Sequence, residues 1–263
     1  MNFNLDFLRF RFIALVVSVS FILVSFATIS IQQLQLGLDF TGGTLVEVGF
    51  TETVDPEEIR TYLEGNQIDA LVQAFGSDKD LLIKIPSSEN IENANIVIDS
   101  LKEQYSFQLR RSGFVGPQVG GELRDQGGLG LLAALLVMMI YIMFRFQYKF
   151  AIGAVVALFH DVLIVLGIFS IFRLEFDLSV LAALMAVIGY SLNDTIVVSD
   201  RIRENFRAKR KLNSEQVINR SLNNTLGRTL ITSLTTLLVL FSLLFLGGEI
   251  IRNFAIALSI GVV

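Results

Sequence analysis

Six runs of apolar residues constrain the fold of this chain more than any other feature of its sequence. An α-helix needs about 20 mostly apolar residues to cross the hydrocarbon core of a bilayer, because each residue adds about 1.5 Å. The hydrophobic fraction of 52% and the mean hydropathy of +0.61 agree with this class. The pattern predicts a polytopic α-helical membrane protein with six transmembrane helices, at 12–30, 129–146, 150–172, 178–199, 226–246 and 250–263.

The first and last runs leave alternatives open. A cleaved signal peptide is the alternative for the first run, but the run is long and no A-x-A-like cleavage site follows it, which favours a retained anchor. The last run has 14 residues, about 21 Å of helix against the ~30 Å that a span requires. We therefore expect the natural chain to continue beyond Val263.

Basic residues predict the orientation, because short loops rich in Lys and Arg remain on the cytoplasmic side. We expect both termini to be cytoplasmic. The stretch from Arg201 to Lys211 is interpreted as a topology signal that contacts anionic lipid, and docking to a cytoplasmic partner is the weaker alternative. The basic features on this side are Arg9, Arg11, Arg145, Lys149 and a cytoplasmic loop at about 200–224.

The segment 31–127 falls on the opposite, extracytoplasmic side and is acidic, with 16 Asp and Glu against 7 Lys and Arg. It is the one predicted soluble domain, between a cytoplasmic N-terminus with helix 1 (1–30) and helices 2 to 6 (128–263). Its βαββαβ order predicts an α+β ferredoxin-like domain. The expected elements are strand 44–50, helix 55–65, strands 68–75 and 80–86, helix 87–105 and strand 106–115.

Two local sequence patterns in this domain predict a turn and the ends of a helix. Gly42 and Gly43 are interpreted as a tight turn into the first strand, and a hinge or a partner contact is the alternative. The first helix carries its own start and stop residues. They are Asp55 at the N-cap, Pro56 at the first helical position, Glu58 at the third and Gly65 at the end.

Composition excludes several classes of function. The chain has no cysteine and one histidine, His160, so thiolate nucleophiles, iron–sulfur clusters and thiolate zinc sites are excluded. No GxxxxGK[ST] phosphate loop and no Ser/His/Asp constellation is visible, and we predict no enzyme activity, no cofactor and no nucleic-acid partner. If the protein performs work, the energy must therefore come from a nucleotide that a partner hydrolyses or from an ion gradient.

Asp194 is a carboxylate inside a predicted span, where it costs roughly 2.5–3.5 kcal/mol on insertion scales. Such a residue usually faces the protein interior and has a partner. Arg228, at the start of the fifth span, lies ~6 Å from the basic side against ~9 Å for Asp194, if the two helices are antiparallel. We therefore expect Asp194 and Arg228 to meet.

Polar residues at helical spacing surround this predicted pair, on one face of each span, and together would form a polar seam between the helices. In the third span, His160 and Asp161 point about 100° apart, so only one of them can face this seam. We expect it to be Asp161, near mid-membrane, and His160 to be a packing or hydrogen-bonding residue. The supporting residues of the polar seam are predicted to be Tyr190, Ser191, Asn193, Thr232 and Thr235.

The expected pair has a use in proton coupling. Proton entry would neutralise Asp194, weaken its hold on Arg228 and let the two helices shift. One proton moved through 100 mV supplies ~2.3 kcal/mol. The alternatives are a static ion pair that fixes helix packing, or an Arg228 side chain that extends to the lipid headgroups and never meets Asp194.

Five motifs follow one another along the chain: GLDFTGGT (37–44), VGPQVGGEL (115–123), HDV (160–162), SLNDTIVVSDRIREN (191–205) and RTLITSLTT (228–236). Together they resemble the SecD/SecF family of protein-export membrane proteins, within the resistance-nodulation-division superfamily. The resemblance covers nearly the whole chain in order and spacing. In that family the aspartate of an NDT motif and an arginine opening the fifth span are associated with proton-coupled function, and they fall here on Asp194 and Arg228.

The resemblance implies an auxiliary subunit of the bacterial Sec translocase, which with SecD uses the protonmotive force to drive or complete protein export. The implied partners are SecD in a heterodimer, the SecYEG channel, YajC, the translocating preprotein, protons and membrane lipids. A small-molecule exporter of the same superfamily and a passive scaffold of the translocon are the alternatives. A single small periplasmic domain argues against the exporter, because exporters of that superfamily carry two large extracytoplasmic regions.

Overall fold

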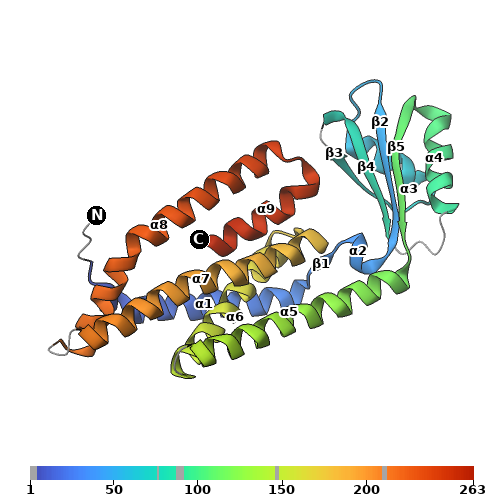
Figure 1. The fold of residues 1–263 in the computed structure, drawn as a ribbon. Helices are drawn as coiled ribbons and strands as arrows, with labels where there is room; N and C mark the ends of the chain where they lie inside the picture. The colour runs from blue at the N-terminus through green and yellow to red at the C-terminus, as the bar shows by residue number, and fades with distance from the viewer. Residues whose placement is uncertain (1–4, 76, 87–91, 146–147, 209–211) are drawn as a thin grey trace.

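The computed structural model describes residues 5–75, 77–86, 92–145, 148–208 and 212–263. Six helices form an elongated bundle, and a four-stranded sheet with two helices stands at one end of it (Figure 1). A 3-10 turn precedes the first helix of the bundle. The bundle helices are α1 (Arg11–Gln32), α5 (Pro117–Arg145), α6 (Tyr148–Ile171), α7 (Leu178–Ala208), α8 (Ser214–Leu246) and α9 (Glu249–Val262).

Five helices of the described residues are long and apolar enough to cross a membrane. The sixth predicted span corresponds to α9, whose apolar part, Ile251–Val262, is shorter than the others. The chain is therefore a helical membrane protein whose described part has five helices of spanning length, where the sequence predicted six. The five are Phe7–Gln32, Pro117–Arg145, Phe150–Ile171, Leu178–Ala208 and Ser214–Leu246.

The segment at about 200–224, which the sequence predicted to be a loop, is mostly helical. α7 continues to Ala208, and α8 begins at Ser214 behind a capping box. Arg201 supports the added turns of α7 through an ion pair with Glu204 at 2.8 Å, one helical turn away. The correction arises because charged residues with good helix propensity extend both helices past the apolar region, which hydropathy alone does not detect.

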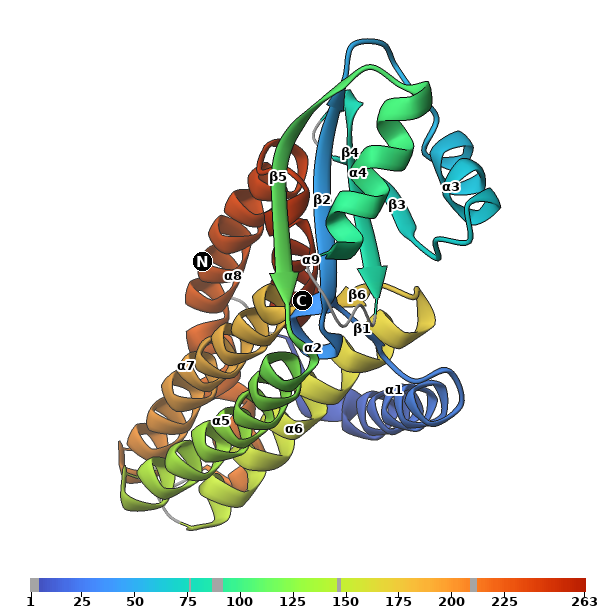
Figure 2. The same ribbon diagram turned by 90° about the vertical axis from the view of Figure 1, so that its right-hand side faces the viewer.

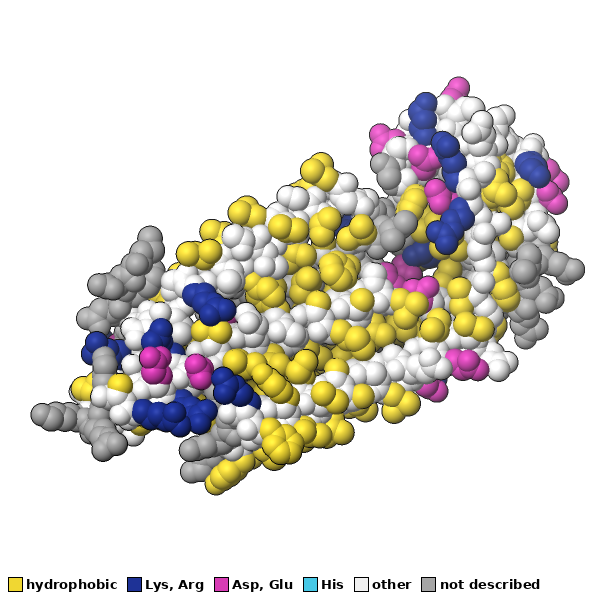
Figure 3. Space-filling model, viewed as in Figure 1, with side chains coloured by type: hydrophobic (Ala, Val, Ile, Leu, Met, Phe, Trp, Pro, Cys, Tyr) yellow, Lys and Arg dark blue, Asp and Glu magenta, His cyan; other side chains and the backbone are white. Residues whose placement is uncertain are grey.

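The bundle has its core around α7. Ala183, Leu184 and Ile188 of this helix are buried in one cluster with Phe169 of α6 and Ala257 of α9. The outer faces of the helices are apolar as well, and the charged side chains gather at the two ends of the molecule (Figure 3). A bundle that is apolar inside and outside is suited to a lipid environment.

The α+β part has the predicted element order, strand–helix–strand–strand–helix–strand. Its sheet is antiparallel throughout, in the order β3-β4-β2-β5. The third element starts later than predicted, and residues 87–91 of the predicted second helix lie outside the described residues. The elements are β2 (Gly43–Phe50), α3 (Pro56–Gly65), β3 (Leu71–Phe75), β4 (Ser77–Pro86), α4 (Glu92–Gln104) and β5 (Phe107–Val115), and the short helix α2 (Leu38–Thr41) precedes them.

Both helices of this domain pack on one face of the sheet (Figure 2). Alternate residues of the central strands, such as Val46 of β2 and Ile83 of β4, are buried together with Leu63 of α3 and Leu101 of α4. This alternation is the period of two that a half-covered strand requires. The domain therefore has a core of its own, separate from that of the bundle.

The start of α3 follows the predicted cap, with one difference. The Asp55 side chain accepts a hydrogen bond from the Glu57 N–H at 3.0 Å, and Pro56 occupies the first turn. Glu58 does not complete a capping box: its carboxylate accepts a hydrogen bond from the Tyr105 hydroxyl at 2.9 Å. Glu58 thereby ties α3 to the chain that follows α4.

The domain joins the bundle through a tightly packed neck. Gly42 and Gly43 have φ of 74° and 142°, a region that favours glycine. A Cβ on Gly42 would lie 2.7 Å from Pro117 Cα, and one on Gly43 would lie 2.4 Å from the Ile85 carbonyl oxygen. The tight-turn interpretation of this pair is confirmed. Pro117 also opens α5, which starts well before the predicted apolar run.

A second connection was not predicted. The two-residue strand β1 (Gln35–Leu36), after α1, pairs in parallel with β6 (Glu175–Phe176), between α6 and α7. Asp39 extends this connection by accepting a hydrogen bond from the Leu178 N–H at 3.1 Å, at the first residue of α7. The α6–α7 connection is therefore fixed to the chain segment that enters the domain.

Candidate functional site

A polar contact joins α6 and α7 inside the apolar bundle. Ser191 Oγ of α7 donates a hydrogen bond to Asp161 Oδ2 of α6 at 2.7 Å. The other carboxylate oxygen of Asp161 lies 2.9 Å from His160 Nδ1 on the same helix. The side chains of His160 and Asp161 are each about three-quarters buried. Asp161 thus faces a residue of the predicted seam, and His160 acts as its hydrogen-bonding neighbour, as the sequence predicted.

A second polar contact joins α7 and α8. The Tyr190 hydroxyl and Thr236 Oγ1 are 2.8 Å apart, and either can donate. The predicted partners on α8 do not take part, because Thr232 and Thr235 donate to backbone carbonyls of their own helix. Thr236 was not among the predicted residues, although the i+4 spacing from Arg228 to Thr232 continues to it.

Asp194 and Arg228 do not meet in this structure. No hydrogen bond or ion pair joins either side chain to another residue within the described ranges. Asp194 is half-buried, whereas Arg228 is exposed on the outside of the bundle. The predicted contact is therefore corrected, and the exposed position of Arg228 resembles the alternative in which this side chain extends outward.

The helix register explains why this contact is missing. Asn205 Nδ2 donates to Ser221 Oγ at 2.9 Å, and this contact has the same antiparallel register between α7 and α8 as Tyr190 with Thr236. In that register Asp194 is level with Thr232, not with Arg228. Arg228 lies one turn, about 6 Å, nearer to the basic end of the bundle.

Asn193 is the remaining residue of the predicted seam, and it is exposed. Adjacent residues of a helix point about 100° apart, so Asn193 turns away when Tyr190 and Ser191 face α8 and α6. The seam in the structure is therefore narrower than predicted. It runs from Asp161 through Ser191 to Tyr190, with Asp194 one turn further along α7.

A cavity of about 870 Å³ lies beside Asp161, between α1, α6 and α9. Its walls are mainly apolar, with Ser18 and Ser25 of α1 among the polar exceptions. His160 Nε2 and Ser259 Oγ line it and are buried without a hydrogen-bond partner within the described residues. This cavity offers a polar wall on which water could be held beside the Asp161 carboxylate.

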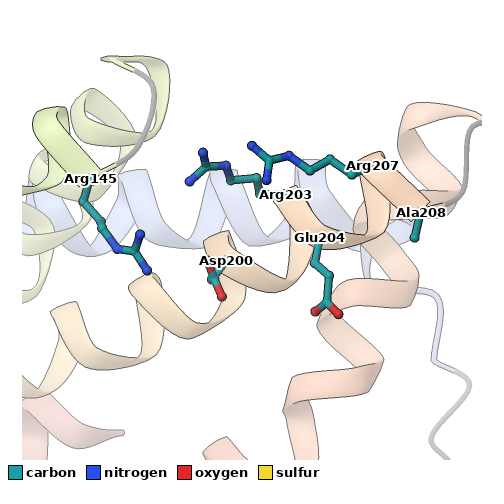
Figure 4. Close-up of a pocket in the computed structure, with 6 residues that line it drawn as sticks. All are labelled: Arg145, Asp200, Arg203, Glu204, Arg207 and Ala208. Atoms are coloured by element: carbon teal, nitrogen blue, oxygen red, sulfur yellow. The ribbon is translucent and has the colours of Figure 1, made fainter.

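A second hollow, of about 630 Å³, lies at the basic end (Figure 4). Arg203 and Arg207 lie one turn apart on α7, and Arg145 reaches the same region from α5. Asp200 and Glu204 are interspersed with them. This mixture of charges lies outside the apolar part of the bundle.

Two family models match the chain. The C-terminal domain of the protein export membrane proteins SecD/SecF matches residues 96–263. The SecD/SecF GG motif matches residues 28–54, which include the Gly42–Gly43 turn.

Curated relatives match nearly end to end. The protein translocase subunit SecF of Vibrio alginolyticus is 45% identical over 265 residues, which cover 98% of this chain and 84% of that protein. SecF of Pseudomonas aeruginosa is 45% identical over 263 residues, with 98% and 86% covered. SecF of Rickettsia prowazekii is 40% identical over 266 residues, with 99% and 86% covered.

Solved structures of SecDF match the fold. SecDF of Thermus thermophilus, described as a translocon-associated membrane protein, superposes with a TM-score of 0.89 and 34% identity, and covers 99% of this chain. SecDF in a super-membrane-facing form superposes with a TM-score of 0.75, also at 34% identity, and covers 100%. In both cases this chain spans 36% of the solved chain, about a third of its length.

Proposed function

This chain belongs to the SecD/SecF family of protein-export membrane proteins, and we propose that, with a SecD subunit, it uses the protonmotive force to drive or complete protein export across the bacterial inner membrane. A Sec-associated role is supported by the SecF relatives and by the SecDF fold. SecYEG and YajC are proposed as further partners on the strength of family membership. The exported preprotein is the proposed substrate.

The finer architecture belongs to the same proposal. We assign α9 as the sixth transmembrane element, because Ala255 and Ala257 bury it against the bundle. The antiparallel order β3-β4-β2-β5 with two helices on one face supports the ferredoxin-like class for the soluble domain. The basic end, with the N-terminus, is placed in the cytoplasm, and the acidic domain in the periplasm.

The observation that carries the proton part is the pair of carboxylates inside neighbouring helices. Asp161 of α6 is held by Ser191, and Asp194 lies one turn from Ser191 on α7. Each costs roughly 2.5–3.5 kcal/mol at the centre of a bilayer, and carboxylates inside spans are the usual parts of proton relays. An ionised carboxylate only accepts hydrogen bonds, whereas a protonated one also donates. Protonation of Asp161 therefore changes the contact between α6 and α7.

The proposed coupling uses two registers of α7 and α8. In the register seen here, Asp194 and Arg228 are one turn apart, and their side chains make no contact within the described residues. A relative shift of about one turn would bring them level, and protonation of Asp194 would release them again. One proton moved through 100 mV supplies ~2.3 kcal/mol, about 40-fold in a two-state equilibrium.

The test is force-dependent export of a secreted substrate into inverted membrane vesicles. Asp194→Asn is expected to lose the increment that the protonmotive force adds, while SecD still co-purifies. Asn193→Ala is the matched control, because this neighbour is exposed and is expected to keep the increment. An unchanged increment in Asp194→Asn would overturn the proton role of Asp194 and move the search to Asp161.

A passive scaffold is the second candidate, because Asp161 already has hydrogen-bonding neighbours in Ser191 and His160. A purely structural role, the fixing of helix packing, is enough to explain buried polar contacts of this kind. Under this alternative, Asp194→Asn and Asp161→Asn would both keep the force-dependent increment. The small-molecule exporter is separated by deletion of the gene, which would then change drug sensitivity and leave protein export intact.

A further inference from the structure

Lys84 and Glu175 form an ion pair between the α+β domain and the membrane bundle. The two residues are 91 positions apart in the chain. The Lys84 side chain is 14% exposed and that of Glu175 is 15% exposed. Ion pairs on the surface of the same domain, such as Lys102 with Asp99, are 63% and 73% exposed. The Lys84–Glu175 pair is thus shielded from water and salt, whereas the surface pairs are screened.

Each partner is fixed to a different rigid unit. Lys84 lies within β4, in register with Leu45 of β2 on one side and Leu71 of β3 on the other. Glu175 lies in β6, in register with Gln35 of β1. Its carbonyl oxygen also accepts a hydrogen bond from Asn253 Nδ2 of α9 at 3.1 Å. Through Glu175, the domain is therefore connected to the segments next to α1, α6, α7 and α9.

A cavity also lies between the domain and the bundle. This cavity, of about 530 Å³, separates the start of β4 from the turn between α8 and α9, with Ser77 and Asp78 on one wall and Phe245 and Gly248 on the other. Neck residues Gly42 and Pro117 connect the two units by the backbone, but a neck by itself leaves the tilt of the domain open.

Glu175 also occupies a particular place in the proposed proton machinery. The connection in which it lies links α6, which carries Asp161, to α7, which carries Ser191 and Asp194. A shift of α6 against α7 must therefore displace this connection. Because Lys84 is bound to Glu175, the displacement is passed to the centre of the sheet.

We propose that Lys84 and Glu175 are positioning residues that set the tilt of the α+β domain on the membrane bundle and transmit movement of the α6–α7 connection to it. The second half of this proposal rests on the proposed proton-driven function. The first half stands on the geometry of the ion pair and is tested separately. Removing one partner leaves a shielded charge without compensation, so reversal of either charge should release the domain.

The first measurement is a distance distribution by pulsed electron paramagnetic resonance on the full chain in complex with SecD. The chain has no cysteine, so spin labels on Thr61→Cys of α3 and Ser242→Cys of α8 are the only ones on this subunit. Both positions are exposed. We expect one narrow distribution in the parent, a broader one in Lys84→Glu and in Glu175→Lys, and a return to the narrow distribution when both reversals are combined.

Lys102→Glu is the matched control, since it makes the same substitution in the same domain at an exposed pair. It should leave the distribution narrow. A distribution that stays narrow in Lys84→Glu would overturn the positioning role. A double reversal that stays as broad as the single ones would overturn it as well, because only a direct interaction is rescued by exchanging the charges.

The second measurement is the increment that the protonmotive force adds to protein export into inverted membrane vesicles. We expect Lys84→Glu and Glu175→Lys to reduce it roughly 5-fold or more, the lower range of coupling between sites, and the double reversal to restore it. A released domain with an intact increment would overturn the transmission role. If the parent itself shows no increment, the proposed function fails, while the distance measurement still decides the positioning role.

Discussion

The carboxylates inside the bundle differ in how their surroundings hold them. Asp161 has two hydrogen-bonding neighbours, His160 and Ser191, whereas Asp194 has no bonded side chain within the described residues. A group already satisfied by its surroundings is costly to move, and an unsatisfied one gains from any partner that comes within reach. At the scale of single residues, Asp194 is therefore the carboxylate whose contacts can change most when α7 and α8 move.

Tyr105 gives a residue-scale prediction outside the membrane. Partial burial, followed by the hydrogen bond and the negative charge of Glu58, raises the pKa of the Tyr105 hydroxyl above its usual value of 10.0. The unfolded chain then ionises first, so the contribution of Tyr105 to stability is complete below about pH 10 and is lost as the pH rises through the raised pKa. Tyr105→Phe should lower stability by about 1 kcal/mol at neutral pH and weaken the loss above pH 10.

Thermal denaturation of the full protein in detergent at a series of pH values measures this difference. Tyr141→Phe, at an exposed position of α5, serves as the control and should keep the alkaline loss of the parent. An equally steep alkaline loss in Tyr105→Phe would show that another group is responsible.

At the scale of helices, contacts between small residues set how closely the elements approach. Gly167 of α6 packs directly on Ser25 of α1, and a Cβ on Gly167 would lie 2.1 Å from Ser25 Oγ and 2.7 Å from Ser25 Cα. Small residues let membrane helices come together at backbone distance, where packing and polar contacts replace the missing hydrophobic driving force. The α1–α6 contact therefore depends on this glycine.

Gly167→Ala is expected to destabilise the bundle by about 1–3 kcal/mol, the usual cost of overpacking. Gly153→Ala is the matched control on the same helix, because a Cβ there meets nothing within 4 Å. The apparent melting temperature in detergent is measured by the loss of the monodisperse peak in size-exclusion chromatography. It should fall for Gly167→Ala and stay the same or rise for Gly153→Ala. Equal melting temperatures would mean that α1 moves aside without cost.

At the scale of the whole molecule, charge is separated along the long axis. The acidic domain stands at one end, and Arg203 and Arg207 lie at the other, with apolar surface between them (Figure 3). Such a distribution favours one orientation in a membrane, with the basic end in the cytoplasm. The five helices of spanning length then cross between these two ends.

Thiol labelling tests this orientation, since the chain contains no native cysteine. In cells with a permeabilised outer membrane, a membrane-impermeant maleimide should label Asp99→Cys on α4 and leave Arg207→Cys at the end of α7 unlabelled. Both positions are exposed in the structure, so access decides the result. Opening the inner membrane should make Arg207→Cys reactive, and labelling in the reverse order would invert the proposed topology.

Elements that depend on local interactions can be predicted from the sequence. Apolar runs located the helices of spanning length, and the Asp55–Pro56 start of α3 and the Gly42–Gly43 turn follow from short-range geometry. The sequence overestimated the loop at 200–224, because charged residues continue a helix beyond the apolar region on which the boundary was placed.

The tertiary structure alone decided which residues meet. The relative height of Asp194 and Arg228 along the bundle depends on the register of α7 against α8. A difference of one helical turn decides whether the two side chains can touch. The pairing of β1 with β6 involves two residues each, too few for any periodic signal. The Lys84–Glu175 pair joins residues 91 positions apart. Such contacts are set by the packing of whole elements against one another, which no local pattern of residues encodes.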